Sequence, residues 1–133
     1  LAALAVHDAG RQAVDDGYTM ARAAAGCRHG SVRIATERAL TWAGPCAAGD
    51  GLGIAGAEVV VVDRDPAVAA ARLIDLLLGS GGELVTVLVG AAAHHPEALV
   101  DGLAAHVHRR HPGTEFTSYR TGHRGDVLLI GVE

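Results

Sequence analysis

The spacing of apolar side chains in the first quarter of the chain predicts a helix followed by a short strand. Between Arg11 and Ala25 the apolar residues recur every three or four positions and Gly26 supplies a stop, which is typical of an amphipathic helix. The alternation from Ser31 to Glu37 predicts an exposed strand. Residues 1–6 are all apolar and fit either the tail of a helix or a strand.

The middle of the chain predicts a hairpin, a helix and a buried strand. The turn-rich segment from Gly44 to Gly56 leads into a β-branched run, Glu58 to Asp63, and the two together indicate a hairpin. Asp65 then supplies a helix cap before a proline, and we expect this helix to extend to Leu78. Leu84 to Val89 is apolar on both faces apart from Thr86, as in an interior strand.

The C-terminal part predicts one more helix and two closing strands. The helix is expected to open at His95 and to end at His111, since proline follows each of them. Strands are predicted over residues 114–120 and 127–132. The chain is therefore expected to form one α+β (α/β-like) domain over residues 1–133. Its two layers are a mixed sheet and the helices packed on it, and its second half follows the order β-α-β-α-β-β.

Composition narrows the classes of function. Half of the residues are hydrophobic but only 3% are aromatic, so the core offers few stacking platforms for bases or sugars. The net charge of −4 disfavours a nucleic-acid or anionic-membrane surface, because both need a basic field. No segment has the pattern of a membrane span or a signal peptide, so we expect a cytoplasmic protein. An apolar start without Met indicates a fragment of a longer chain.

Gly51, Gly53 and Gly56 match the string GxGxxG found in dinucleotide-binding proteins. That motif requires a strand before the glycines and a helix after them, so that backbone N–H groups meet the pyrophosphate. Here the glycines run directly into the predicted strand from Glu58. We therefore expect a glycine-rich hairpin and no bound nucleotide.

Histidine and cysteine are plentiful enough to suggest a metal, but their spacing does not support one. His106 and His108 point to nearly opposite sides of a helix, which leaves His108 and His111 as the near-aligned pair. Cys27 and Cys46 form no CxxC motif. No carboxylate is marked as a further ligand, and no serine lies in a nucleophile elbow. The sequence thus predicts no metal site and no catalytic residue.

One polar loop is the best local candidate for binding. It holds Arg120, Thr121, Gly122, His123, Arg124 and Gly125. Such a loop can bind a carboxylate or a phosphate. The donors are two guanidinium groups, an imidazole, a hydroxyl and the backbone N–H groups that the two glycines leave accessible. The alternative is a plain hairpin turn between the last two strands, with its charges facing solvent.

Five short motifs, in order, resemble one family. They are Leu1 to Asp8, Asp15 to Met20, Gly49 to Ile54, Gly82 to Gly90 and Ile130 to Glu133. This series resembles the C-terminal region of the A subunit of fatty acid kinase, a family also called dihydroxyacetone-kinase-like or DAK-phosphatase-like. The chain departs from the family at Thr121 to Leu128, where relatives usually carry Gly-Gly-Gln-Pro followed by Tyr and Pro.

The resemblance implies a role as well as a fold. In this family ATP and magnesium belong to a separate kinase domain of the parent protein, so no cofactor is expected in this fragment. The C-terminal region resembles DegV-like fatty-acid-binding proteins and implies a non-catalytic interaction and dimerisation domain of a bacterial kinase. Its expected partners are an acyl-binding DegV-like protein and a second copy of the chain. The alternative is a module that binds a fatty acid or phosphate head group through Thr121 to Gly125.

Overall fold

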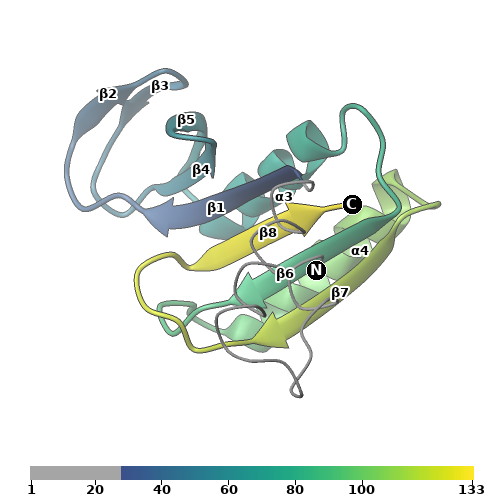
Figure 1. Cartoon of the computed structure of the whole chain (residues 1–133). Helices are drawn as coiled ribbons and strands as arrows, with labels where there is room; N and C mark the ends of the chain where they lie inside the picture. The colour runs from purple at the N-terminus through teal and green to yellow at the C-terminus, as the bar shows by residue number, and fades with distance from the viewer. Residues whose placement is uncertain (1–27) are drawn as a thin grey trace, which may run out of the picture.

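The computed structural model describes residues 28–133 (Figure 1). The segments predicted over residues 1–6 and 11–25, together with Cys27, lie outside the described residues. In the part described, the main sheet consists of β1 (Arg28–Ile34), β4 (Gly51–Ala55), β5 (Glu58–Asp63), β6 (Leu84–Val89), β7 (Glu115–Arg120) and β8 (Leu128–Val132). A separate hairpin consists of β2 (Ala39–Thr41) and β3 (Gly44–Cys46).

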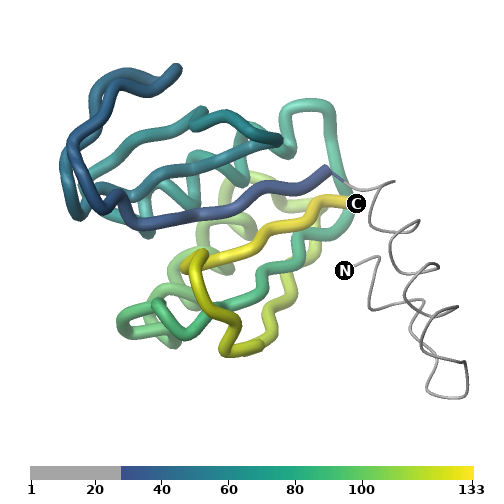
Figure 2. Tube along the Cα trace, turned by 60° about the vertical axis from the view of Figure 1, so that its left-hand side comes forward, coloured from purple at the N-terminus to yellow at the C-terminus, as the bar shows by residue number. Residues whose placement is uncertain are grey.

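The strands of the main sheet lie in the order β5-β4-β1-β8-β6-β7. β6 and β7 run parallel, and the other neighbouring strands are antiparallel. β8 lies between β1 and β6, as Figure 2 shows, although it is the last strand in the sequence. The predicted mixed sheet is confirmed.

Two helices, α3 (Pro66–Leu77) and α4 (Pro96–Arg110), form the second layer behind the sheet in Figure 1. The core lies between the layers, where the largest fully buried side chains include Leu73, Leu103 and Ile130. Within residues 28–133 no helix is long and apolar enough to cross a membrane.

Both helices begin where the sequence predicts, and α3 also has the expected side-chain cap. The Asp65 carboxylate accepts a hydrogen bond from the backbone N–H of Ala67 at 2.9 Å, which satisfies one of the free donors at the start of α3. α4 begins after His95, whose φ of 50° is left-handed and whose side chain makes no capping bond. Proline at the first turn suits both helices, because the missing N–H has no helical partner there.

Glycines in the sheet allow α3 to approach closely. A Cβ at Gly51 would lie 2.6 Å from the Cα of Pro66, and one at Gly53 would lie 3.4 Å from the Cβ of Leu73. A Cβ at Gly30 would lie 3.1 Å from Cδ2 of Leu73. These glycines therefore leave the room in which Leu73 is completely buried.

The GxGxxG string forms the glycine-rich hairpin that the sequence predicts. Gly51 and Gly53 lie within β4, and Gly56 forms the turn to β5 with a φ of 64°. A left-handed φ explains why glycine is found at the turn. Within the motif, then, the glycines serve helix packing and chain reversal.

The connection from β7 to β8 differs from the alternative of a simple hairpin. β7 pairs with β6, and β8 pairs with β6 on the other side, so the two closing strands are not neighbours. The hairpin interpretation is therefore wrong. The physical reason is that a long polar loop can cross the end of an intervening strand, and β6, which is apolar apart from Thr86, offers a partner on both of its edges.

The close approach of α3 gives a stability prediction. Replacing Gly51→Ala should lower the free energy of unfolding by about 1–3 kcal/mol, because its Cβ meets backbone that cannot move aside easily. Gly102→Ala is the matched control, since Gly102 lies in α4 with open space around it. That change should raise the free energy of unfolding by about 0.5–1 kcal/mol. Urea denaturation measures both, and equal effects would contradict the packing argument.

Candidate functional site

The polar loop and both helix starts gather at one end of the sheet. We call this the loop end and define it by residues 120–127, the β6–α4 connection over residues 90–95, and the first turn of α3. In Figure 1 it lies on the left, where the arrowheads of β1 and β6 point. Because β6 and β7 are parallel, their carboxyl ends meet here, which is a common location for binding sites in sheets with helical crossovers.

The loop crosses directly over the end of β6. The N–H of Thr121 donates to the carbonyl of Val89 at 3.1 Å, and the N–H of Ala91 donates to the carbonyl of His123 at 2.8 Å. Gly90 lies beneath the crossing, and its N–H donates to the carbonyl of Val127 at 2.9 Å. A Cβ at Gly90 would collide with the carbonyl oxygen of Asp126 and lie 2.7 Å from Nε2 of His123. The crossing is therefore a close-packed contact.

His123 is turned inward against this crossing. Its Nδ1 shares a hydrogen bond with the hydroxyl of Thr121, which fixes the orientation of the ring. Its Nε2 is buried and has no hydrogen-bond partner among the described residues. The imidazole thus packs against Gly90 and points away from the outer surface of the loop.

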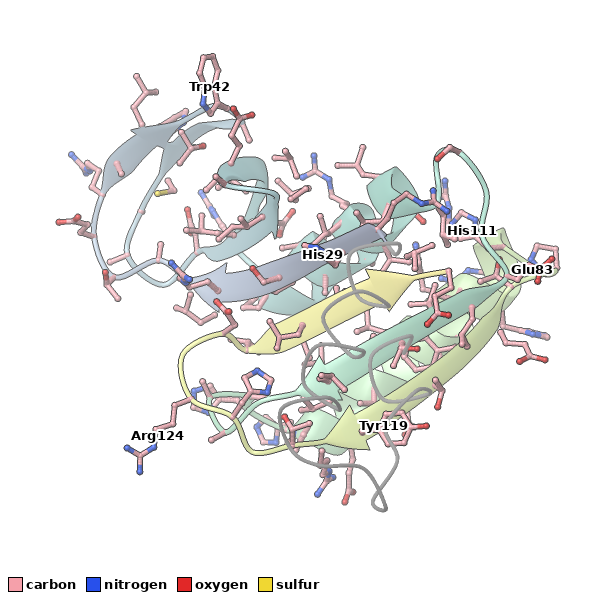
Figure 3. All side chains as sticks on the ribbon, viewed as in Figure 1. His29, Trp42, Glu83, His111, Tyr119 and Arg124 are labelled. Carbon is pink, nitrogen blue, oxygen red and sulfur yellow. The ribbon has the colours of Figure 1, made fainter. Side chains whose placement is uncertain are left out.

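The loop arginines do not converge with His123. The Nη2 of Arg120 lies 3.1 Å from Oε1 of Glu97 at the start of α4. Arg124 extends away from the ribbon (Figure 3). Gly122 and Gly125 have φ angles of 64° and 97°, so they shape the turn. In this conformation the predicted anion-binding groups are spread over three directions.

A shallow cavity of about 350 Å³ lies beside the loop, between the starts of α3 and α4. Its apolar lining includes Ile34, Leu99 and Val127, and its polar lining includes His94 and His95. The volume is near the lower end of small-molecule sites. Its lining does not include His123, so the cavity is no tunnel ending at that residue.

The β2–β3 hairpin, residues 39–46, carries the most exposed large apolar side chains in the described part of the chain. Leu40 is 85% exposed and Trp42 is 84% exposed. The hairpin is ordered by Thr41, whose hydroxyl donates to the carbonyl of Gly44 at 2.6 Å and accepts from the N–H of Ala43 at 3.2 Å. Figure 3 shows Trp42 at the edge of the molecule, directed away from the sheet.

A polar cluster lies between α3 and α4, near their C-terminal ends. Oδ1 of Asp75 accepts hydrogen bonds from Nε2 of His106 at 2.8 Å and from Nε2 of His111 at 2.7 Å. Burial alone would raise the pKa of Asp75. The hydrogen bonds from His111 and His106 and the nearby charges of His106 and Arg110 outweigh it, so the pKa lies below its ordinary value.

Comparison with known protein families identifies the family of this chain. A family model described as FakA-like, for the C-terminal region of the A subunit of fatty acid kinase, matches residues 1–133. The chain belongs to this family. No individual curated protein matches the sequence. The predicted resemblance is confirmed, and membership links this FakA-like C-terminal domain to the fatty acid kinases.

Sequence reasoning missed two features of this domain. The apolar pattern over residues 38–43 predicts neither a helix nor a strand. The segment nevertheless contains a Leu and the only Trp of the chain, among polar and small residues. An isolated Trp in such a segment is the signal that points to an exposed hairpin. Helical spacing pairs His108 with His111, whereas the structure brings His106 and His111 together at Asp75. The reason is that His111 is the C-cap, with non-helical φ and ψ of −134° and 67°.

The lowered pKa of Asp75 predicts an acid-sensitive contribution to stability. In the folded state the carboxylate keeps its charge to a lower pH than in the unfolded state. The contribution is therefore present above the unfolded pKa of about 3.9 and is lost as the pH falls through the folded pKa. Asp75→Asn should be less stable than the wild type at pH 5, and the difference in the free energy of unfolding should shrink as the pH falls below the unfolded pKa of about 3.9 and the wild-type carboxyl becomes protonated.

Urea denaturation at each pH, with EDTA present, measures this difference. Asp101→Asn is the control, because Asp101 is exposed on α4. If the difference in the free energy of unfolding between the wild type and Asp75→Asn increases as the pH falls, the lowered pKa of Asp75 is contradicted.

Proposed function

We propose that this domain is the non-catalytic docking and dimerisation domain of an ATP-dependent fatty acid kinase, and that it receives an acyl-binding partner protein on the β2–β3 hairpin. The observation that carries this proposal is the exposure of Leu40 and Trp42 on one ordered hairpin. Phosphoryl transfer, with its ATP and magnesium, is assigned to the kinase domain of the parent protein. Family membership supports the link to that parent.

Burial of these two side chains would contribute strongly to binding. Tryptophan is enriched among the few interface residues that carry most of the binding energy, because it combines a large apolar area with one N–H donor. The hairpin is already ordered by the bonds of Thr41. Little conformational freedom would therefore be lost when a partner binds.

The hairpin and the loop end both lie on the left in Figure 1, with the hairpin above the sheet and the loop below it. Arg124 is exposed there, and the cavity next to Val127 offers a shallow apolar depression. A partner that contacts the hairpin would have to extend over the whole left side of the molecule in Figure 3 to reach this guanidinium as well. The loop residues, including the tightly packed His123, would then support the surface more than bind an anion.

Trp42→Ala in the full parent protein should weaken binding of the acyl-binding partner by about 30-fold or more, as expected of a hot-spot residue worth at least ~2 kcal/mol. Leu40→Ala should have a smaller effect in the same direction. Leu76→Ala is the matched control, because Leu76 is 58% exposed near the C-terminal end of α3, outside the hairpin. Calorimetry measures the affinities.

The described domain has a direct optical reporter for the same test. Trp42 is the only tryptophan of the chain, so in the isolated domain its fluorescence should shift to shorter wavelength when the partner covers it. Equal partner binding by Trp42→Ala and Leu76→Ala, or by a parent protein without residues 1–133, would refute docking on this domain. A change in sedimentation without loss of the partner would assign the hairpin to the dimer interface.

A second candidate function is supported by the cavity of about 350 Å³. In this alternative a fatty acid or phosphate head group binds at the loop end, with Thr121 to Gly125 closing over it. Ala98→Trp should then fill the cavity and abolish fatty-acid binding in calorimetry, while Arg124→Ala and His123→Ala should each weaken it about tenfold. Unchanged binding in all three variants would refute this alternative.

A further inference from the structure

Three metal-ligating side chains converge at the opposite end of the helical layer. Asp75 comes from α3, His106 from α4 and His111 from the C-cap of α4. One oxygen of Asp75 contacts both Nε2 atoms at 2.8 and 2.7 Å, and the three ligand atoms all lie within 4.8 Å of one another. Figure 3 shows His111 far from Trp42, so the cluster is separate from the proposed docking surface.

The fold holds these side chains in place from two directions. α3 and α4 pack against each other through the core cluster that includes Leu73 and Leu103. The N–H of His111 donates to the carbonyl of Val107 at 2.8 Å, which fixes the backbone at the end of α4. Both imidazoles therefore approach the carboxylate from positions set by buried structure.

We propose that Asp75, His106 and His111 form a three-ligand site for a divalent transition metal of the zinc class. Two imidazole nitrogens and one carboxylate oxygen, with a fourth position left to water, are a common donor set for zinc in proteins. Imidazole donors disfavour Mg²⁺ and Ca²⁺, which prefer oxygen ligands. The bound ion would link α3 to α4 directly.

The geometry needs only a small adjustment to hold the ion. Ligand atoms at about 2.0–2.2 Å from a tetrahedral zinc lie roughly 3.3–3.5 Å from one another. The two contacts of Asp75 must therefore open by roughly 0.5–0.8 Å, and the two Nε2 atoms, which lie within 4.8 Å of each other, must reach the same spacing through side-chain rotation. The side chains of Asp75, His106 and His111 are 29%, 15% and 24% exposed, so water can reach the fourth position.

Arg110 opposes the ion by its charge, but it is poorly placed to block it. Its Nε lies 3.9 Å from Oδ2 of Asp75, the oxygen that neither histidine contacts, and its side chain is 62% exposed. In that position Arg110 can orient the carboxylate while Oδ1 faces the imidazoles. The repulsion is weakened by solvent around the guanidinium.

Zinc titration of the chain by calorimetry tests the proposal. We expect one bound Zn²⁺ per chain, a higher Tm in the presence of zinc, and no effect of Mg²⁺ at the same concentration. His106→Gln and His111→Gln should each weaken zinc binding roughly 100-fold. Co²⁺, used as an absorbing probe, should show the d–d spectrum of a four-coordinate site in the wild type and lose it in both variants.

His108→Gln is the matched control, because His108 is exposed on the same helix turn. This variant should bind zinc as the wild type does. If the histidine variants do not fold, the nearly isosteric Asp75→Asn replaces them, with an expected loss of tenfold or more. Absence of zinc binding, or binding that persists in the triad variants or is lost in His108→Gln, would overturn the proposal.

Discussion

The close approach of α3 to the sheet is the constraint on which the rest of the described structure depends. Gly30, Gly51 and Gly53 leave no side chain in its way, and Leu73 fills the space above them. This contact fixes the position of α3 against the sheet. Its first turn lines the cavity at the loop end, and its last turns present Asp75 to α4. A side chain on β4 would therefore disturb two distant regions together.

Local patterns are sufficient to predict most of the elements. The cap at Asp65, the proline after His95 and the apolar run from Leu84 to Val89 each act through neighbouring residues, and the structure confirms them. Boundaries differ by a few residues, as for β1, which ends at Ile34 and not at Glu37. The last pairing of β1 joins Ile34 to Gly51 of β4, and the sequence around Ile34 does not show where that partner begins.

The candidate site is less predictable because its geometry depends on distant pairings. Composition identifies the loop residues, but the inward orientation of His123 follows from Gly90, which lies far earlier in the chain. The contact of Asp75 with two histidines requires that α3 and α4 lie side by side. The exposure of Trp42 depends on a short hairpin that forms outside the main sheet. Periodicity along one segment carries no information on such contacts.

The position of β8 has a consequence for how the domain forms. Strands β5, β4 and β1 on one side, and β6 and β7 on the other, are joined in the sheet only through residues 128–132 within the described part of the chain. During synthesis the early strands and α3 leave the ribosome well before β8. The edge of β1 that later pairs with β8 therefore stays unpaired during that time. An unpaired strand edge can form hydrogen bonds with a strand of another protein chain. Late closure of the sheet, after both of its parts have been made, is thus built into the topology.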